Sequence, residues 1–117
     1  MPHTRIPSSG RLPFSAAVVA GPLCFVSGQI GDPAASIEEQ AGQALLQVFS
    51  ILGEAGFTPE ELVSVHVALV DMADYDAMNT VYAAAFDGKP LPARLAYQVA
   101  ALPLGARVEI QATAARD

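Results

Sequence analysis

Apolar residues recur at two different spacings along the chain, and these spacings predict where helices and strands lie. A spacing of three and four residues, typical of an amphipathic helix, runs from Ile37 to Leu52 and again from Tyr75 to Phe86. Alternation of apolar and polar residues, typical of a strand with one buried face, occupies residues 16–19, 23–30, 63–69, 93–99 and 106–112. The predicted order is ββαβαββ, and residues 1–13, which contain three prolines, are predicted to form an extended arm or loop.

Capping signals mark the starts of both predicted helices. The stretch Ser36-Ile37-Glu38-Glu39 has the form of a capping box, in which the serine side chain accepts a hydrogen bond from the backbone near Glu39. Asp71, Asp74 and Asp76 cluster at the start of the second helix, where carboxylates favour the helix dipole, so capping explains them without calcium. The apolar stripes of both helices are interpreted as core.

The last two predicted strands are interpreted as an antiparallel hairpin. Leu95 and Tyr97 are then expected to face the core. In the same pairing Glu109 faces Ala96 and lies diagonal to Arg94, roughly 7–8 Å away at the Cβ atoms. This arrangement predicts either an ion pair or a gap that holds a small molecule.

The predicted architecture leaves one face of the sheet without a cover, because two amphipathic helices cover only the other. That open face is expected to carry polar and small residues, namely Ser64, His66, Ala68, Arg94, Ala96, Gln98 and Glu109. Such a face is either solvated or closed by another subunit. We favour closure by copies of the same chain, with a cleft where the subunits meet.

Composition narrows the class of protein. The chain has 117 residues, which predicts one domain over residues 1–117. Its net charge of −6, with only six scattered basic residues, argues against binding to nucleic acid or to an acidic membrane surface. Cys24 is the only cysteine, so neither an intrachain disulfide nor a multi-cysteine metal site is expected. No run approaches the ~20 apolar residues of a membrane span, so the expected location is the cytoplasm.

Arg94 and Glu109 are the candidates for chemistry. An arginine presents a planar fork that holds a carboxylate by two parallel hydrogen bonds. A glutamate beside it can position or deprotonate water, with exposed backbone groups at Gly28 and Ala96 holding other substrate atoms. The alternative, a simple cross-strand ion pair, remains open on the residues alone. The chain has no glycine-rich phosphate loop and no nucleophile elbow, and its two histidines are not at metal-ligand spacing.

Five segments together resemble a known family. In order they are residues 23–30 (LCFVSGQI), 37–40 (IEEQ), 79–82 (NTVY), 92–94 (PAR) and 99–112 (VAALPLGARVEIQA). They resemble the RidA family, also called YjgF/UK114, over nearly the whole chain. The resemblance implies an α+β chorismate-mutase-like fold and a homotrimer with clefts between subunits.

The resemblance also implies an activity and the residues that carry it. The implied reaction is hydrolysis of reactive enamines and imines, such as 2-aminoacrylate and other 2-imino acids, to 2-oxo acids and ammonia, without a metal or cofactor. Arg94 matches the arginine that binds the substrate carboxylate, and Glu109 matches the glutamate that orients the water. The implied substrate-binding positions are Phe14, Ser27, Gly28, Asn79 and Ala96, with backbone contacts at Gly28 and Ala96.

Three departures from the family pattern bear on the substrate. Phe14 stands where a pocket tyrosine is usual, the pair Leu95-Ala96 replaces a more polar pair, and the loop 31–36 is several residues shorter. They favour a larger or more apolar imino acid, or a pathway-specific deaminase such as one acting on 2-aminomuconate. The competing hypothesis is a non-catalytic or chaperone-like trimer that binds a small ligand. A third activity attributed to relatives, endoribonuclease, is disfavoured by the acidic charge.

Overall fold

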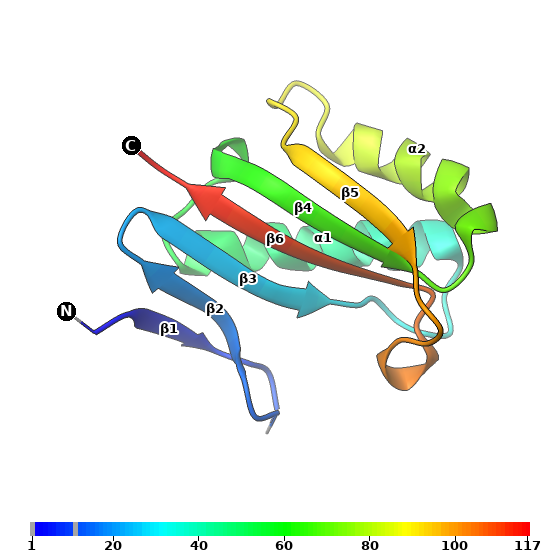
Figure 1. The fold of residues 1–117 in the computed structure, drawn as a ribbon, viewed down its shortest axis with the longest axis horizontal. Coiled ribbons are helices and arrows are strands. Elements are labelled where there is room, and N and C mark those ends of the chain that lie inside the picture. Colours follow the sequence, from blue (N-terminus) through cyan, green and yellow to red (C-terminus); the bar gives the residue numbers. More distant parts are fainter. Residues whose placement is uncertain (1, 11) are drawn as a thin grey trace.

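The computed structural model describes residues 2–10 and 12–117, and its strands form one six-stranded sheet in the order β1-β2-β3-β6-β4-β5 (Figure 1). The strands are β1 (Thr4–Pro7), β2 (Ser15–Ala20), β3 (Leu23–Gln29), β4 (Leu62–Leu69), β5 (Ala93–Gln98) and β6 (Val108–Ala115). The helices are α1 (Ile37–Glu54) and α2 (Tyr75–Ala85), with short 3₁₀ turns η1 (Pro59–Glu61), η2 (Met72–Asp74) and η3 (Pro103–Gly105).

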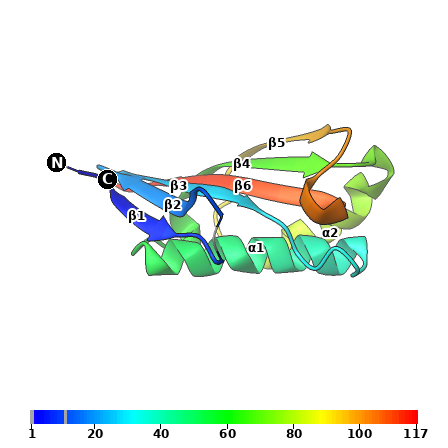
Figure 2. The same ribbon diagram turned by 90° about the horizontal axis from the view of Figure 1, so that it is seen from below.

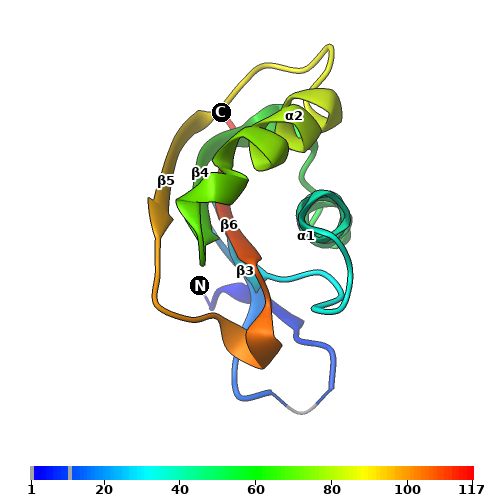
Figure 3. The same ribbon diagram turned by 90° about the vertical axis from the view of Figure 1, so that its right-hand side faces the viewer.

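Both helices lie against the same face of the sheet, and the opposite face is uncovered (Figure 2 and Figure 3). The predicted α+β class, with two helices packed on one side of a mixed sheet, is therefore confirmed. The predicted capping box is also present, because the Glu39 backbone N–H donates to Ser36 Oγ over 3.1 Å. The layer between helices and sheet is the core, whose fully buried side chains include Val26, Leu45, Leu52, Val67, Leu69, Met78 and Ile110. Each large aliphatic side chain buried there stabilises the fold by about 1.5–3 kcal/mol.

The prediction of an extended arm or loop over residues 1–13 missed a strand at residues 4–7. They form β1, which pairs with β2 in antiparallel fashion, with Thr4 opposite Val19. The pairing shifts register at Pro7, which has no N–H to donate and is tolerated because β1 is an edge strand. Met1 and Arg11, which belong to the same predicted arm, lie outside the described residues.

The predicted hairpin between the last two strands is also wrong, because β4 lies between β5 and β6 (Figure 1). β5 pairs with β4 in parallel, with Arg94 beside Val65. β6 pairs with β4 in antiparallel fashion, with Glu109 beside Ala68. Arg94 and Glu109 are thus two strands and three residues apart, so their backbones lie roughly 14 Å from each other at ordinary strand spacings.

The side chains of β5 face the opposite way from the prediction. Leu95 and Tyr97 lie on the uncovered face and are 47% and 43% exposed. Arg94 and Ala96 turn toward the helices, where Arg94 contacts α2 and Ala96 packs against the core. Glu109 alternates with two buried residues of β6 and lies on the uncovered face, as predicted.

The crossing from β5 to β6 passes the end of β4 and is held by polar contacts. The Arg107 guanidinium reaches both oxygens of Asp74 at 2.7 and 2.9 Å, and the Arg107 backbone N–H donates to Oε1 of the fully buried Gln40 over 2.9 Å. The Asp74 side chain, predicted to act as a cap, makes this ion pair and no capping bond. Because Arg107 is two residues from Glu109, these contacts fix where β6 begins.

No helix in the described ranges is both long enough and apolar enough to span a lipid bilayer.

Candidate functional site

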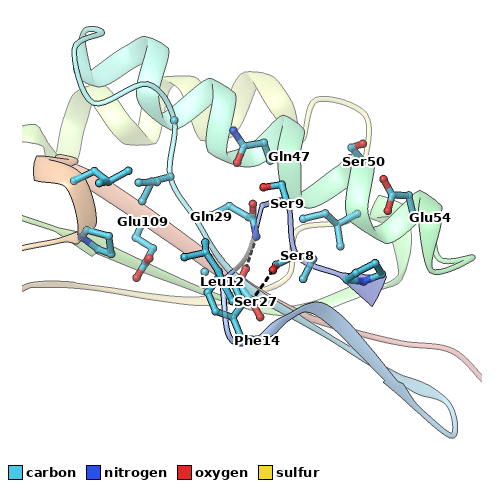
Figure 4. A pocket seen from close by; sticks show the side chains of 18 residues that line it. Ser8, Ser9, Leu12, Phe14, Ser27, Gln29, Gln47, Ser50, Glu54 and Glu109 are labelled. Carbon is cyan, nitrogen blue, oxygen red and sulfur yellow. Dashed lines mark hydrogen bonds between the residues drawn. The ribbon is translucent and has the colours of Figure 1, made fainter. Parts of the chain in front are cut away.

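A cleft of about 1180 Å³ opens where β3 ends, between the β1–β2 segment, α1 and η3 (Figure 4). We call it the Glu109 cleft. Its lining residues are Pro7, Ser8, Ser9, Leu12, Phe14, Ala16, Ser27, Gly28, Gln29, Ile30, Gly31, Gln47, Ser50, Ile51, Glu54, Pro103, Leu104 and Glu109. Four of the seven predicted site residues therefore meet here, namely Phe14, Ser27, Gly28 and Glu109.

Glycine at position 28 makes room for the Glu109 carboxylate. A Cβ atom built on Gly28 would lie 2.8 Å from Glu109 Cδ and 3.0 Å from Oε2, which is closer than real Cβ contacts. The ion pairs recorded for the described residues join Arg107 to Asp74 and Arg116 to Glu61 and leave the Glu109 carboxylate out. The carboxylate thus keeps its acceptor capacity for a ligand or a water molecule.

Ser27 and Phe14 both line the cleft (Figure 4). The Ser27 hydroxyl donates to the Ser15 carbonyl oxygen over 2.6 Å, so its proton is already used and its oxygen offers only acceptor capacity. Phe14 is 48% exposed and adds an apolar wall without a hydroxyl group. Position 14 therefore provides contact area to a ligand and no hydrogen bond.

A second, smaller pocket of about 370 Å³ lies beside α2 and contains Arg94 and Asn79. We call it the Arg94 pocket. Tyr82, Ala83, Leu91 and Pro92 complete its lining. Ala96, the remaining predicted residue, lines neither pocket and lies two residues from Arg94 on the edge strand β5.

Two tyrosines and a methionine surround the Arg94 guanidinium. Its Cζ atom lies 4.8 Å from the centre of the Tyr82 ring and 5.7 Å from that of Tyr75. One guanidinium nitrogen donates to Tyr75 Oη over 3.2 Å, and the other approaches Met78 Sδ at 3.9 Å. Aromatic faces hold a cation in place without neutralising its charge. In the described part of the chain the guanidinium has no carboxylate partner, so the predicted alternative of an ion pair with Glu109 is wrong within one chain.

Two buried polar atoms of the Arg94 pocket also have no partner among the described residues, namely Asn79 Oδ1 and Tyr82 Oη. Unpaired buried polar atoms cost free energy and are rare in folded proteins, so both atoms keep capacity for a hydrogen bond to water or to a ligand. Burial raises the pKa of Tyr82, an effect that the nearby Arg94 charge opposes, so the hydroxyl stays protonated at neutral pH.

The sequence did not identify the residues that hold Arg94. The pattern predicts Tyr75, Met78 and Tyr82 only as a helical apolar stripe, and Met78 and Tyr82 are indeed buried. Their spacing places them on one face of α2, and this face meets β5 because Arg94 turns inward. Leu12, Leu104 and the α1 residues Gln47, Ser50 and Glu54 of the Glu109 cleft were missed as well. They come from three separate segments, and no local pattern connects them.

No group of three or more metal-ligating side chains occurs within residues 2–10 and 12–117.

The fold and these pockets define a class of protein: a small α+β sheet protein with an arginine pocket on the helix side of one edge strand and a glutamate cleft at the end of β3. Comparison with known proteins gives the family. The family model described as Endoribonuclease L-PSP matches residues 6–116. The chain therefore belongs to the YjgF/RidA family, as its segments predict.

Individual relatives agree with this assignment. A mouse protein named 2-iminobutanoate/2-iminopropanoate deaminase is 44% identical over 109 residues, which cover 87% of this chain and 80% of the mouse protein. The crystal structure of a YjgF/YER057c/UK114 family member from Mycobacterium tuberculosis has a TM-score of 0.91 at 32% identity and covers 98% of this chain and 100% of its own. The structure of Escherichia coli TdcF with bound serine has a TM-score of 0.88 at 32% identity and covers 97% of this chain and 94% of its own.

Proposed function

We propose that this protein hydrolyses reactive 2-imino acids to 2-oxo acids and ammonia, at a site assembled from two copies of the chain. Arg94 of one copy holds the substrate carboxylate, and Glu109 of another positions and deprotonates the attacking water. The names of the 41–44% identical mammalian relatives, 2-iminobutanoate/2-iminopropanoate deaminases, support the reaction. The proposed assembly is a homotrimer in the cytoplasm, and the reaction requires no metal or cofactor.

The single observation that carries this proposal is the guanidinium of Arg94. It is fixed between two tyrosine rings and has no carboxylate partner among the described residues. A charge held in this way is a preformed receptor for an anion, and the guanidinium fork matches a carboxylate. A 2-imino acid supplies a carboxylate directly beside its reacting carbon.

The separation of the two pockets supports a site shared between copies. Arg94 reaches toward the helices at one edge of the sheet, whereas Glu109 lies on the other face with β4 between their strands. A head-to-tail contact between copies brings the edge of one chain to a different surface of the next, and such contacts close into rings. We infer that the edge strand β5 of one copy lies against the Glu109 cleft of its neighbour.

The available groups suit the hydrolysis step by step. As a water oxygen bonds to the carbon of the protonated imine, the Glu109 carboxylate takes one water proton, and the electron pair of the C=N bond moves to nitrogen. That proton then passes to the amine nitrogen of the tetrahedral intermediate. The Glu109 carboxylate then takes the hydroxyl proton while the C–N bond breaks and its electron pair leaves with ammonia, so the C–O bond becomes the carbonyl of the 2-oxo acid. The proton on Glu109 passes to the released ammonia or to water, which restores the carboxylate.

Ser27, Asn79 and the backbone positions complete the proposed site. Because the Ser27 hydroxyl already donates to Ser15, only its oxygen lone pairs are available, which suits an imine N–H and not a carboxylate. Asn79 offers a buried, unpartnered carbonyl oxygen beside Arg94, which is also suited to a donor. The backbones of Gly28 and Ala96 contact the substrate from the two sides.

An endoribonuclease activity has less support, although it appears in the description of the family model. The charged residues that line the Glu109 cleft in the described chain are Glu54 and Glu109, and both repel phosphates. The chain carries a net charge of −6. RNA binding needs cationic contacts that release counterions, and the described residues of the cleft lining supply none.

Mixing two inactive variants tests the proposal. Arg94→Ala and Glu109→Gln proteins are each expected to lose nearly all acceleration of 2-oxo acid release from imino acids that an amino-acid oxidase generates in situ. Refolded together in equal amounts, they are expected to recover about one quarter of wild-type activity, because about a quarter of the sites between copies then join an intact arginine to an intact glutamate.

The matched control refolds two differently tagged batches of Arg94→Ala together. Co-purification of the tags proves mixing, and no activity is expected. Recovery only in the unlike mixture supports the shared site. Mixed assemblies without activity would place both residues in one copy, and a wild-type protein that accelerates no imino acid would overturn the deaminase itself.

A further inference from the structure

The pairing between β3 and β6 is irregular where Gly28 meets Glu109. The recorded pairs on either side of the irregularity are Val26 with Ala112 and Gln29 with Ile110. Two residues of β3 therefore face one residue of β6, which is the arrangement of a β-bulge. A bulge interrupts the ladder of hydrogen bonds and bends its strand. The ladder between these two strands thus does not set the gap between Gly28 and the Glu109 carboxylate by itself.

One buried side chain bridges the two strands beyond the bulge. Gln40, in the first turn of α1, is 0% exposed. Its Nε2 donates to the Ala35 carbonyl oxygen over 2.9 Å, and its Oε1 accepts from the Arg107 backbone N–H over 2.9 Å. These partners fix the orientation of the amide, because a carbonyl requires a donor and an N–H requires an acceptor. Gln40 therefore ties the loop that follows Gly28 to the residues that precede Glu109.

The loop end of this bridge is anchored on α1. A Cβ atom built on Gly31 would lie 2.9 Å from the Cα and the backbone oxygen of Gln40, so the loop backbone lies directly against the helix. The Asp32 backbone N–H also donates to Gln43 Oε1 over 2.6 Å. Among the described residues Gln43 bonds to this loop and not to β6. The two glutamines thus hold the same loop, but only Gln40 connects it to β6.

The β6 end of the bridge is anchored as well. The Val70 backbone N–H, directly after β4, donates to the Arg107 carbonyl oxygen over 3.1 Å. The Arg107 guanidinium meanwhile reaches both oxygens of Asp74 in η2. Arg107 is therefore fixed to the end of β4 and to η2, and the Gln40 side chain spans two anchored ends.

We propose that Gln40 is a positioning residue, whose bridge sets the gap between Gly28 and the Glu109 carboxylate and so the place of the attacking water. This inference rests on the proposed deaminase function and adds to it a residue that touches neither the substrate nor the water. Misplacing a catalytic group by about 1 Å costs rate. Binding of the substrate carboxylate depends instead on Arg94, in a separate pocket. Loss of the bridge therefore lowers kcat and leaves KM unchanged.

The first test replaces the amide by an apolar side chain of similar length. Gln40→Met removes both hydrogen bonds and keeps the volume. With the imine that an amino-acid oxidase generates from 2-aminobutyrate, kcat is expected to fall about tenfold and KM to stay within about twofold of wild type. Gln43→Met is the matched control on the same helix and the same loop, and its kcat is expected to stay within about twofold of wild type. Circular dichroism verifies that each variant is folded at the assay temperature.

The second test makes the bridge depend on pH. In Gln40→Glu a neutral carboxyl group can accept from Arg107 and donate to Ala35, whereas an ionised one repels the Ala35 carbonyl. Burial without a cationic partner raises the pKa of such a carboxyl. The charged side chains that the β6 end brings to this junction, Arg107 and Asp74, pair with each other. On α1 and its loop, Glu39 and Asp32 are exposed.

The expected signature is a change in the ratio of variant kcat to wild-type kcat at the same pH. For Gln40→Glu this ratio is expected to be about one tenth above the pKa of the new carboxyl and to return to near one as pH falls below it. Dividing by the wild-type value cancels the titration of Glu109. Gln43→Glu is the matched control, and its ratio is expected to stay constant across the same pH range.

The outcomes separate the positioning role from the deaminase function. An active wild type with normal kcat in folded Gln40→Met, or with a rise in KM alone, would overturn the positioning role and leave the deaminase intact. Equal losses in Gln40→Met and Gln43→Met would show that holding the loop is what matters, which also overturns it. Failure of both Gln40 variants to fold would make Gln40 a residue of the fold alone. A wild type that accelerates no imino acid would remove both proposals.

Discussion

The Arg94 pocket and the Glu109 cleft hold their charged groups in opposite ways. Arg94 is fixed by direct contacts with the two tyrosines and Met78 of its pocket. The Glu109 carboxylate instead occupies space that exists only because Gly28 has no side chain. The first is a small pocket beside α2, and the second is a larger cleft between the β1–β2 segment, α1 and η3.

The difference matches the work proposed for each group. A carboxylate receptor gains from rigidity, because every substrate presents the same carboxylate and a preorganised partner binds it at less entropic cost. A group that accepts a proton from water must keep free acceptor capacity, so it gains from having few partners. Variants that loosen the first pocket or fill the second should therefore have different kinetic effects.

The largest effect is expected from Arg94→Lys, which keeps the charge and removes the fork. An ammonium group neither donates two parallel bonds nor stacks as well between the rings of Tyr75 and Tyr82. We expect kcat/KM for 2-imino acids to fall about 100-fold, consistent with the loss of a strong charge-assisted bidentate contact. Steady-state assays with an oxidase-generated imine check this, and near-normal activity would show that charge alone suffices.

Gly28→Ala is expected to have the next largest effect. The new methyl group displaces the Glu109 carboxylate and should lower kcat about tenfold while KM changes little, because misplacing a catalytic group by about 1 Å already costs rate. The far end of a side chain gives way, so the melting temperature should stay near that of wild type. The matched control is Gly53→Ala in α1, where an added Cβ meets open space. A rise in KM with kcat unchanged would contradict this positioning role.

Tyr75→Phe should have a smaller effect, and one on KM instead of kcat. It removes the hydroxyl that accepts from Arg94 over 3.2 Å and keeps the ring. Without this bond the guanidinium samples more orientations, so we expect KM to rise about fivefold with kcat unchanged, as for the loss of one ordinary hydrogen bond worth about 1 kcal/mol. A change confined to kcat would argue that Tyr75 acts on the reaction itself.

The smallest effect concerns pH and stability. Burial raises the pKa of Tyr82 above its ordinary value of 10.0, although the charge of Arg94 opposes the shift. Because the folded state binds this proton more tightly, its contribution to stability is complete below pH 10 and is lost as pH rises through the folded-state pKa. The free energy of unfolding, measured with urea at a series of pH values, should therefore fall less steeply above about pH 10 in Tyr82→Phe than in wild type. Parallel curves for the two proteins would contradict the shift.

The amphipathic elements could be predicted from local signals. The capping box at Ser36 and the apolar stripe of α1 lie within one stretch of chain, so spacing alone locates them. The partner of β5 could not be predicted in this way. The alternation predicts that residues 93–99 form a strand, but it does not indicate which strand pairs with it. The actual partner, β4, lies about 30 residues earlier in the sequence.

The predicted orientation of the Arg94 side chain was wrong for a related reason. Leu95 and Tyr97 are the more apolar side of β5, and the pattern assigns them to the core. In the structure the opposite side packs on α2, because the tyrosine rings accept a cation that an aliphatic core would not. The site residues themselves were named through the family resemblance, and their division between two pockets follows from the strand order.

That strand order also bears on how the chain folds. β6 lies between β3 and β4, so the centre of the sheet is supplied by residues 108–115, long after both of its neighbours in the sequence. Until those residues leave the ribosome, β3 and β4 have no shared partner and each exposes an unpaired edge to other nascent chains. Because these contacts have long sequence separation, we expect the sheet to close late and slowly, with the greatest aggregation risk in the interval before closure.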